Sequence, residues 1–248
     1  MSNEHSGRGP RVVIIGGGFG GFSAAYALEG LAKGGVEATL VSADNSMTYT
    51  PFLPQAASGT LEPRHVVVPL RRALRRTRLL VGAAVAHDGE ARTILFRSES
   101  GEEHAVAYDQ LILAPGSVSR TAPVPGLSDA AVGFKTLAQA IHLRNHVLKR
   151  LEAASVTEDP AERDAQLTFV FVGGGYAGVE ALAELEDLVR DALAAWPRGH
   201  GLAPRWVLIE ATESIFPEVG SRLAAYALRQ LVARGIEVRM GTLVEDCL

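Results

Sequence analysis

The stretch RVVIIGGGFGGFSAAYALEG, residues 11–30, decides the fold because its glycine turn joins an apolar run to an Ala-rich run. The β-branched residues at 12–15 predict a strand that is buried on both faces. Apolar residues at helical spacing over 22–31 predict a helix, which Gly34 and Gly35 end. A second buried strand is expected at 38–41. Strand, tight turn, helix and strand together form a βαβ unit.

The same pattern begins again at LTFVFVGGGYAGVEALAELEDL, residues 167–188. Here we expect a strand at 168–172, a helix at 177–195, a strand at 206–209, a helix at 220–233 and a strand at 237–240. The repeat is therefore a duplication at the scale of a domain and not a short solenoid repeat.

The rest of the chain carries weaker signals. Residues 1–10 are polar and Gly-rich and are expected to be disordered. Residues 45–70 contain four prolines and show little periodicity, which predicts an extended excursion over the surface. Short apolar runs over 79–113 predict β-structure. An amphipathic helix at 136–155 and a polar, acidic link at 156–166 lead to the second unit.

Composition excludes several classes of protein. With 248 residues, of which 47% are hydrophobic, the chain can bury the core of one large domain or two small ones. A net charge of −4 does not favour nucleic acid. The single cysteine, Cys247, excludes a disulfide framework, a thiolate zinc site and a redox-active pair, and it fits a reducing cytoplasm. No metal site is expected, because His142 and His146 alone have ligand spacing.

Membrane insertion and secretion are not expected either. No apolar run reaches the roughly 18–20 residues that a spanning helix needs. Glycines interrupt the first apolar stretch where the core of a signal peptide has to be continuous.

Both glycine turns fit G-x-G-x-x-G, a pattern that binds dinucleotides. The first glycine permits the sharp turn, the second lets a pyrophosphate approach the backbone, and the third lets helix pack on strand. Free N–H groups at the helix N-terminus then hold the phosphates. A single match is also compatible with glycines that only permit a tight turn, but two matches in the same context favour dinucleotide binding. The glycines are Gly16, Gly18 and Gly21 in the first turn, and Gly173, Gly175 and Gly178 in the second.

The residue that meets the ribose separates the two turns. Glu210 follows the strand after the second turn, where a carboxylate accepts from both ribose hydroxyls and disfavours a 2′-phosphate. NADH is therefore expected there in preference to NADPH. Ser42 holds the equivalent place after the first turn and lacks charge. Asp44, two residues later, either swings in or is only a turn residue.

The arrangement resembles the flavoproteins with two dinucleotide-binding domains. YDQLILAPGS, residues 108–117, is similar to their strand-plus-(A/T)-x-G signature, with Ala114, Pro115 and Gly116 as the matching residues. The resemblance implies an α/β fold of two Rossmann-like units. The FAD unit, at 1–160, is interrupted by a β-rich segment. The NAD(P)H unit, at 161–248, is expected to be incomplete.

Within that group the chain is most similar to type II NADH dehydrogenases. YTPFLPQAASGTLEPRHVVVPLR, residues 49–71, resembles their segment after the second strand, and GGGYAGVEALAEL, residues 173–185, resembles their NADH turn. The resemblance implies that Glu180 faces the nicotinamide–flavin region and influences hydride transfer or quinone reduction. The alternative is that Glu180 and Glu184, at i,i+4 spacing, lie on a solvated helix face.

These considerations give a set of expected site residues, with Glu180 as the catalytic one. Phe19 and Tyr176 hold matching positions in the two turns, where each either packs locally or meets cofactor, and Tyr176 is also placed to gate the nicotinamide. The expected cofactor-binding residues are Gly16, Gly18, Phe19, Gly20, Gly21, Ser42, Asp44, Val85, Ala114, Pro115, Gly116, Gly173, Gly175, Tyr176, Ala177, Gly178, Glu180 and Glu210.

The resemblance implies an FAD-dependent oxidoreductase that passes hydride from NADH to flavin and electrons to a quinone-like acceptor. Disulfide reductases and sulfide:quinone reductases need paired cysteines, which this chain lacks. Family members continue past the NADH unit into a returning strand whose Gly-Asp motif binds the flavin. Because that motif is absent here, the alternative is a truncated, non-catalytic remnant or partial subunit that retains only nucleotide binding.

Expected partners follow from the same comparison. The electron acceptor is a small molecule, and a homodimer or a completing polypeptide is left open. The arginines at 71, 72, 75, 76 and 78 either contact anionic lipid headgroups or keep a helix soluble, and helical spacing favours the second interpretation. We expect a cytoplasmic protein with at most peripheral contact with the inner face of the cell membrane.

Overall fold

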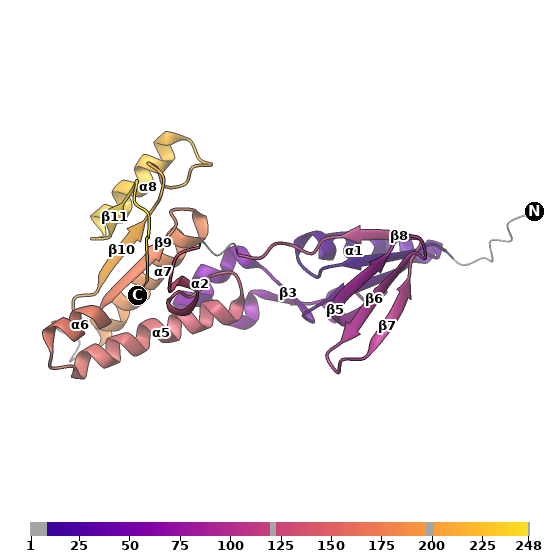
Figure 1. The fold of residues 1–248 in the computed structure, drawn as a ribbon, viewed down its shortest axis with the longest axis horizontal. Helices are drawn as coiled ribbons and strands as arrows, with labels where there is room; N and C mark the ends of the chain where they lie inside the picture. The colour runs from indigo at the N-terminus through magenta and orange to yellow at the C-terminus, as the bar shows by residue number, and fades with distance from the viewer. Residues whose placement is uncertain (1–8, 120–122, 197–200, 248) are drawn as a thin grey trace, which may run out of the picture. The chain divides into compact units, whose positions relative to one another are not determined.

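The computed structural model describes residues 9–119, 123–196 and 201–247. They form two compact units (Figure 1). Unit 1 comprises Met1–Tyr49 and Val67–Val118, and unit 2 comprises Thr50–Val66 and Ser119–Leu248, each within the described ranges. The lead-in expected to be disordered lies outside the described residues up to position 8.

Unit 1 contains a six-stranded sheet in the order β7-β6-β5-β2-β1-β8. Strands β1, β2, β8 and the first part of β5 are parallel, whereas β5, β6 and β7 form an antiparallel meander. The strands are β1 (Arg11–Ile15), β2 (Glu37–Ser42), β5 (Arg78–Asp88), β6 (Thr93–Ser98), β7 (Glu103–Ala107) and β8 (Gln110–Leu113).

Alternation along β1 explains how this sheet is covered on both faces, because successive side chains of a strand point to opposite sides. Val12 and Ile14 pack in one cluster with Ala25 of helix α1 (Phe19–Leu31). Val13 packs in another cluster, with Ile94 of the meander. The remaining elements of unit 1 are η1 (Ala32–Gly34), the antiparallel pair β3 (Ser46–Thr48) and β4 (Val67–Pro69), and the short helix α3 (Leu70–Ala73).

Strand β5 belongs to both parts of this sheet. Its first residues, 78–81, pair with β2, and residues 82–88 pair with β6. The register shifts between Ala84 and Ala86, so Val85 lies at a β-bulge. Bulges are common beside functional sites.

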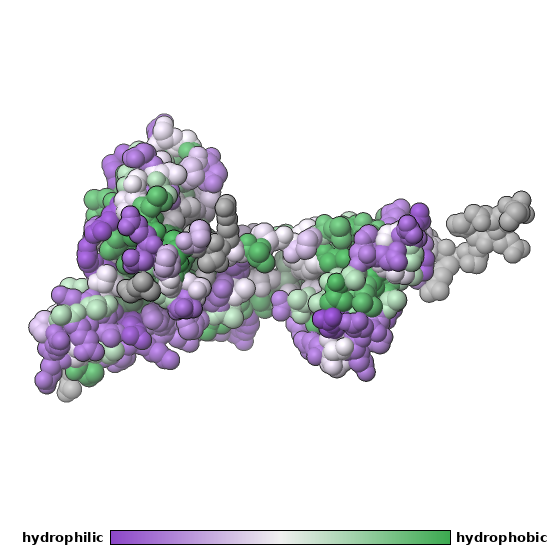
Figure 2. Space-filling view, in the orientation of Figure 1, coloured by the Kyte–Doolittle hydropathy of each residue, from purple (hydrophilic) through white to green (hydrophobic). Residues whose placement is uncertain are grey.

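Unit 2 contains a parallel three-stranded sheet in the order β11-β10-β9. Its strands are β9 (Thr168–Val172), β10 (Arg205–Ile209) and β11 (Glu237–Arg239), and its long helices are α5 (Leu137–Val156), α7 (Tyr176–Ala195) and α8 (Ser221–Ala233). Helix α5 begins with a capping box between Thr136 and Gln139. One face of α5 is buried, and hydrophilic residues cover its exposed side (Figures 1 and 2).

The expectation that residues 45–70 run over the surface was wrong for the middle of that segment. Helix α2 (Leu53–Ser58) lies there, and all but one of its residues are buried. Leu53 and Ala57 pack in the same core as Leu182 of α7. Six residues are too few for periodicity to show, and Pro54 is tolerated because it lies in the first turn. Helices η2 (Thr50–Phe52) and η3 (Pro63–His65) flank α2.

Two further expectations need correction. The polar link at 156–166 contains helix α6 (Pro160–Gln166), which begins where the Asp159 side chain accepts a hydrogen bond from the Ala161 N–H. The short helix α4 (Leu127–Ala130) was not predicted. Helix α3 ends at Ala73, so it contains only the first two of the arginines at 71, 72, 75, 76 and 78. Between the helix expected at 177–195 and the strand expected at 206–209, residues 197–200 lie outside the described residues.

The α/β class with two Rossmann-like units is confirmed. The limits 1–160 and 161–248 were assigned by cofactor and stay a prediction, whereas the two compact units are divisions by packing. Within the described ranges, no helix is both long enough and apolar enough to cross a bilayer.

Candidate functional site

The first glycine turn connects β1 to α1 in unit 1. Gly16 has φ +104°, a backbone conformation that favours glycine, and its N–H donates to the carbonyl oxygen of Val41 at 2.8 Å. Gly18 is the N-cap of α1, and no side-chain hydrogen bond caps this helix within the described residues. Its first N–H groups are therefore available for a phosphate.

The surroundings of this turn differ from glycine to glycine. A β-carbon at Gly16 would overlap the carbonyl oxygen of Ala114, which follows β8. A β-carbon at Gly21 would overlap the carbonyl oxygen of Gly16. At Gly18, in contrast, no described atom beyond its chain neighbours lies within 4 Å of that position. The turn is thus closely packed on both sides of an open position where a pyrophosphate fits.

The other residues expected to meet FAD are also in unit 1. Ser42 ends β2, is 5% exposed and lies against Gly17, where its side chain would overlap an added β-carbon. Asp44 is exposed. Val85 is 37% exposed at the bulge of β5. The remaining expected residues are Phe19 and Gly20 in the first turn of α1, and Ala114, Pro115 and Gly116 directly after β8.

The second turn connects β9 to α7 in unit 2 with the same backbone. Gly173 has φ +107°, and its N–H donates to the carbonyl oxygen of Ile209 at 2.8 Å. Gly175 is the N-cap of α7, and nothing lies within 4 Å of its β-carbon position. A β-carbon at Gly178 would overlap the carbonyl oxygen of Gly173. This turn therefore offers the same open position at a helix N-terminus.

Glu210 follows β10, and its carboxylate is hydrogen-bonded to the second turn. Its Oε2 accepts from the Gly174 N–H at 2.5 Å, and its Oε1 accepts from the Thr212 N–H at 2.7 Å. Burial raises the pKa of this carboxyl, but the hydrogen bonds from Thr212 and Gly174 together outweigh burial and lower the pKa below its ordinary value.

A cavity of about 230 Å³ lies beside Gly173 and Glu210. Residues that the sequence analysis missed complete its lining, among them Val124, Leu127, Thr242 and Leu243. Thr242 and Leu243 follow β11, and ligands of open α/β sheets bind beyond the carboxyl ends of the strands. That rule, applied to the third strand of the second unit, would have found both residues.

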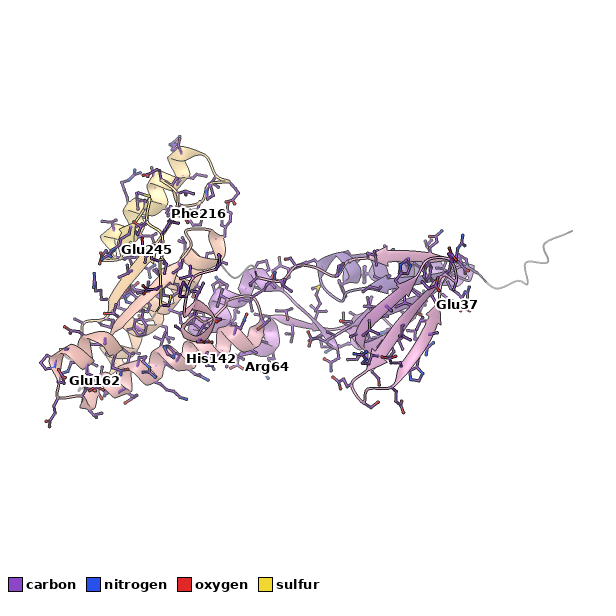
Figure 3. All side chains as sticks on the ribbon, viewed as in Figure 1. Glu37, Arg64, His142, Glu162, Phe216 and Glu245 are labelled. Atoms are coloured by element: carbon purple, nitrogen blue, oxygen red, sulfur yellow. The ribbon has the colours of Figure 1, made fainter. Side chains whose placement is uncertain are left out.

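The loop between β10 and α8 fixes Gly174 from its other side. Phe216 has φ +51°, which is strained for a bulky residue, and its N–H donates to the carbonyl oxygen of Gly174 at 2.9 Å. Its ring, labelled in Figure 3, packs against Tyr176 with centroids 5.0 Å apart. Phe19 in the first turn has a comparable neighbour, because its ring meets Tyr49 at 5.4 Å.

Glu180 lines a second cavity of unit 2, of about 400 Å³. Tyr176 and Ala177 of α7 lie on the same wall, and Thr50, Pro51, Leu53 and Pro54 form part of the opposite wall. Burial, together with the charge of Glu184, raises the pKa of the Glu180 carboxyl above its ordinary value. Raised carboxyl pKa values are typical of functional sites.

These two turns fit a dinucleotide each, because an open glycine N-cap and uncapped helix N–H groups are what a pyrophosphate requires. The sequence model of the pyridine nucleotide-disulphide oxidoreductase family matches residues 10–247 of this chain. The chain belongs to this family.

Two relatives that align with almost the whole chain are NADH:quinone or NAD(P)H-ubiquinone oxidoreductases. The chain is 35% identical to the type II NADH:quinone oxidoreductase NdhA of Mycobacterium tuberculosis, over 94% of its own length and 50% of that protein. It is 34% identical to the external alternative NAD(P)H-ubiquinone oxidoreductase B2 of Arabidopsis thaliana mitochondria, over 94% of its own length and 41% of that protein. The chain thus spans about half or less of the length of these two relatives.

Solved structures share the fold. NDH2 from Plasmodium falciparum, determined in complex with NADH, superposes with a TM-score of 0.89 at 24% identity and covers 97% of this chain and 50% of that one. The sulfide:quinone oxidoreductase of Aquifex aeolicus superposes with a TM-score of 0.72 at 22% identity and covers 97% and 53%. Both comparisons concern the fold alone.

Proposed function

We propose that this chain carries the FAD- and NADH-binding parts of a flavin-dependent NADH:quinone oxidoreductase. The observation that carries the proposal is the presence of two matching glycine turns with unlike ribose partners, Ser42 and Glu210. The first turn is assigned to FAD, with domain limits 1–160, and the second to NADH, with limits 161–248. The names of the M. tuberculosis and A. thaliana relatives support this assignment.

The second turn favours NADH over NADPH for electrostatic reasons. Glu210 is ionised at neutral pH, because its pKa is lowered. Among the described residues, the lining of the adjacent cavity contains this carboxylate and no cation. A second carboxylate, that of Glu213, lies 2.6 Å from the β-carbon position of Gly241, next to Thr242. A 2′-phosphate would meet like charge there without an arginine to offset it.

The first turn supports FAD through uncharged groups. Helix α1 offers its N–H groups to the pyrophosphate, Ser42 offers a hydroxyl to the ribose, and Val85 lies at a bulge of β5, a feature that is common beside functional sites. When bound, FAD supplies the redox chemistry, accepting electrons from NADH and passing them to the acceptor. The protein's part is to position both nucleotides.

Glu180 is the proposed catalytic residue. It lines the cavity beside the second turn, and its raised pKa lets it hold a proton at its carboxyl at a higher pH than an ordinary glutamate does. A quinone as acceptor, a homodimer or completing polypeptide, and a cytoplasmic location with at most peripheral membrane contact stay predictions.

The test uses the purified 248-residue chain with added FAD, from which the excess is removed. We expect a yellow protein that NADH bleaches under anaerobic conditions faster than NADPH does, and that oxidises NADH when a soluble quinone analogue is added. A colourless protein that does not oxidise NADH would overturn the proposal and leave a remnant with nucleotide binding only.

Two matched variants identify the turns. Gly18→Asp and Gly175→Asp are both sterically allowed, because each glycine has an extended backbone and open space at its β-carbon. Aspartate is a good N-cap, so both helices persist, while its charge repels a pyrophosphate. Gly18→Asp is expected to be colourless. Gly175→Asp is expected to stay yellow and not to bleach with NADH, and the reverse pattern would exchange the two assignments.

A further inference from the structure

The cavity beside Glu180 has walls from two segments far apart in sequence. Thr50, Pro51, Leu53 and Pro54 belong to the segment around α2, whereas Tyr176, Ala177 and Glu180 belong to the first turns of α7. The width of the cavity therefore depends on how firmly residues 53–60 are held against α7.

One carboxylate of α7 receives hydrogen bonds from three side chains of the α2 segment. Glu184 Oε2 accepts from Ser58 Oγ at 2.6 Å and from Thr60 Oγ1 at 3.4 Å, and Glu184 Oε1 accepts from Gln55 Nε2 at 3.2 Å. Ser58 is 9% exposed, so this bond to a charged acceptor lies largely out of water. Hydrogen bonds to charged groups in such surroundings are among the stronger ones.

Proton counting gives the direction of this network. The Ser58 hydroxyl has one proton and three oxygen neighbours, of which the carboxylate is the nearest and the strongest acceptor. Ser58 therefore donates to Glu184, and the single proton of the Thr60 hydroxyl is shared between Ser58 Oγ at 2.7 Å and Glu184 Oε2 at 3.4 Å. These hydrogen bonds therefore converge on the carboxyl oxygens of Glu184.

Glu184 lies one helical turn after Glu180, on the same face of α7. Its negative charge adds to burial in disfavouring the ionised form of Glu180. Among the residues that line the cavity, the charged ones are Glu180 on α7 and Lys135 from the segment before α5.

We infer that Glu184 is a positioning residue, which fastens the α2 segment to α7 and so holds open the cavity in which Glu180 meets its ligand. The inference deepens the proposed function and rests on it for the identity of the ligand. The Glu184 side chain acts in two ways that can be measured separately. Its hydrogen bonds hold the α2 segment against α7, and its charge raises the pKa of Glu180.

The first measurement is amide hydrogen exchange of residues 53–60 in the full 248-residue chain. Glu184→Ala is expected to speed exchange of this segment about tenfold or more, because three donors lose their acceptor. Glu184→Gln is expected to keep exchange slow. The Ser58 hydroxyl can donate to the backbone carbonyl oxygen of Gln55 at 3.1 Å, and its oxygen can then accept from the side-chain NH2 group of the new glutamine. Glu180→Gln, one turn earlier on the same helix, is the matched control and is expected to exchange as wild type.

The second measurement is an NMR titration of the Glu180 carboxyl, assigned by its loss in Glu180→Gln. Removing the charge at 184 is expected to lower the pKa of Glu180 in both Glu184→Gln and Glu184→Ala. Ser58→Ala keeps that charge but removes the 2.6 Å bond, so it is expected to loosen residues 53–60 in part and to leave the pKa raised. It also provides a test if Glu184→Ala does not fold.

Either of two results would overturn the inference: unchanged exchange of residues 53–60 in both Glu184→Ala and Ser58→Ala, or an unchanged pKa of Glu180 in Glu184→Gln. A role in packing alone would not move that pKa in the glutamine variant. Neither measurement contains a nucleotide, so a failure of the proposed function, seen as a colourless chain, is distinguishable from a failure of this inference.

Discussion

The two glycine turns have the same backbone and are held in different ways. Gly16 and Gly173 have φ values of +104° and +107°, and each donates to the carbonyl oxygen of the neighbouring strand at 2.8 Å. In unit 1 the neighbouring β8 brings the Ala114 carbonyl oxygen against Gly16. In unit 2, β9 is an edge strand within the described sheet, and nothing lies within 4 Å of the Gly173 β-carbon position.

The difference teaches what supports a phosphate-binding turn. The first turn is packed against its own sheet. The second is tied at Gly174, whose N–H donates to Glu210 and whose carbonyl oxygen accepts from Phe216. The same ligand-binding backbone is thus stabilised by steric packing in one unit and by hydrogen bonds from a loop in the other.

The largest expected effect tests the packing directly. Gly16→Ala combines a left-handed backbone with an overlap and is expected to cost about 2–5 kcal/mol of stability, whereas Gly173→Ala meets only the backbone penalty of about 1–2 kcal/mol. Both tryptophans, Trp196 and Trp206, lie in unit 2. Urea unfolding followed by tryptophan fluorescence therefore reports unit 2, and far-UV circular dichroism reports both units. Equal losses for the two variants would contradict the comparison.

The next largest effect is expected on nucleotide affinity when Glu210 or Ser42, the residues assigned to the ribose, is replaced. Glu210→Ala removes a charged acceptor from two backbone N–H groups, so NADH affinity is expected to fall about 10- to 100-fold. Ser42→Ala removes a neutral hydroxyl, and FAD affinity is expected to fall by less than about tenfold. Fluorescence titration with each nucleotide measures both. An effect of Ser42→Ala on NADH would show that the assignments of the turns are mixed.

A smaller effect is expected when the second turn is made like the first. Glu210→Ser removes the charge that repels a 2′-phosphate, so the ratio of NADPH to NADH affinity is expected to rise about tenfold at most, because no arginine is gained. Competition of NADPH with bound NADH measures this ratio. An unchanged ratio would mean that Glu210 does not face the 2′ position.

The smallest effect concerns pH. The pKa of Glu210 is lowered in the folded chain from an ordinary value of 4.5, so its contribution to stability is present above pH 4.5 and is lost as the pH falls through the folded value. The urea midpoint of unit 2 in Glu210→Gln is therefore expected to lie below that of wild type at pH 7 and to approach it below pH 4. Ser42→Ala, in which no group titrates, is expected to show a difference independent of pH.

Local patterns predicted most of the elements, because β1 and β9 are runs of β-branched and aromatic residues that end directly at a glycine, and β2 and β10 are short apolar runs after a loop. Glu210 was predicted as well, because a residue that follows a parallel strand has a defined place at the edge of the sheet. The bonds from Gln55 and Ser58 to Glu184 were not predicted, since they join residues more than 120 positions apart. The helix at Leu53–Ser58 was missed for a related reason: its stability comes from burial against α7 rather than from its own short sequence.

Strand β5 has a consequence for how unit 1 comes apart. It gives its first residues to the parallel sheet and the rest to the meander, and the two parts meet at Gly82, where φ is +148° and an added β-carbon would overlap the Arg97 carbonyl oxygen. Neither part can lose β5 without opening the edge of the other. Unit 1 is therefore expected to melt as one cooperative block, so that Ser42 and the bulge at Val85 are lost in the same transition.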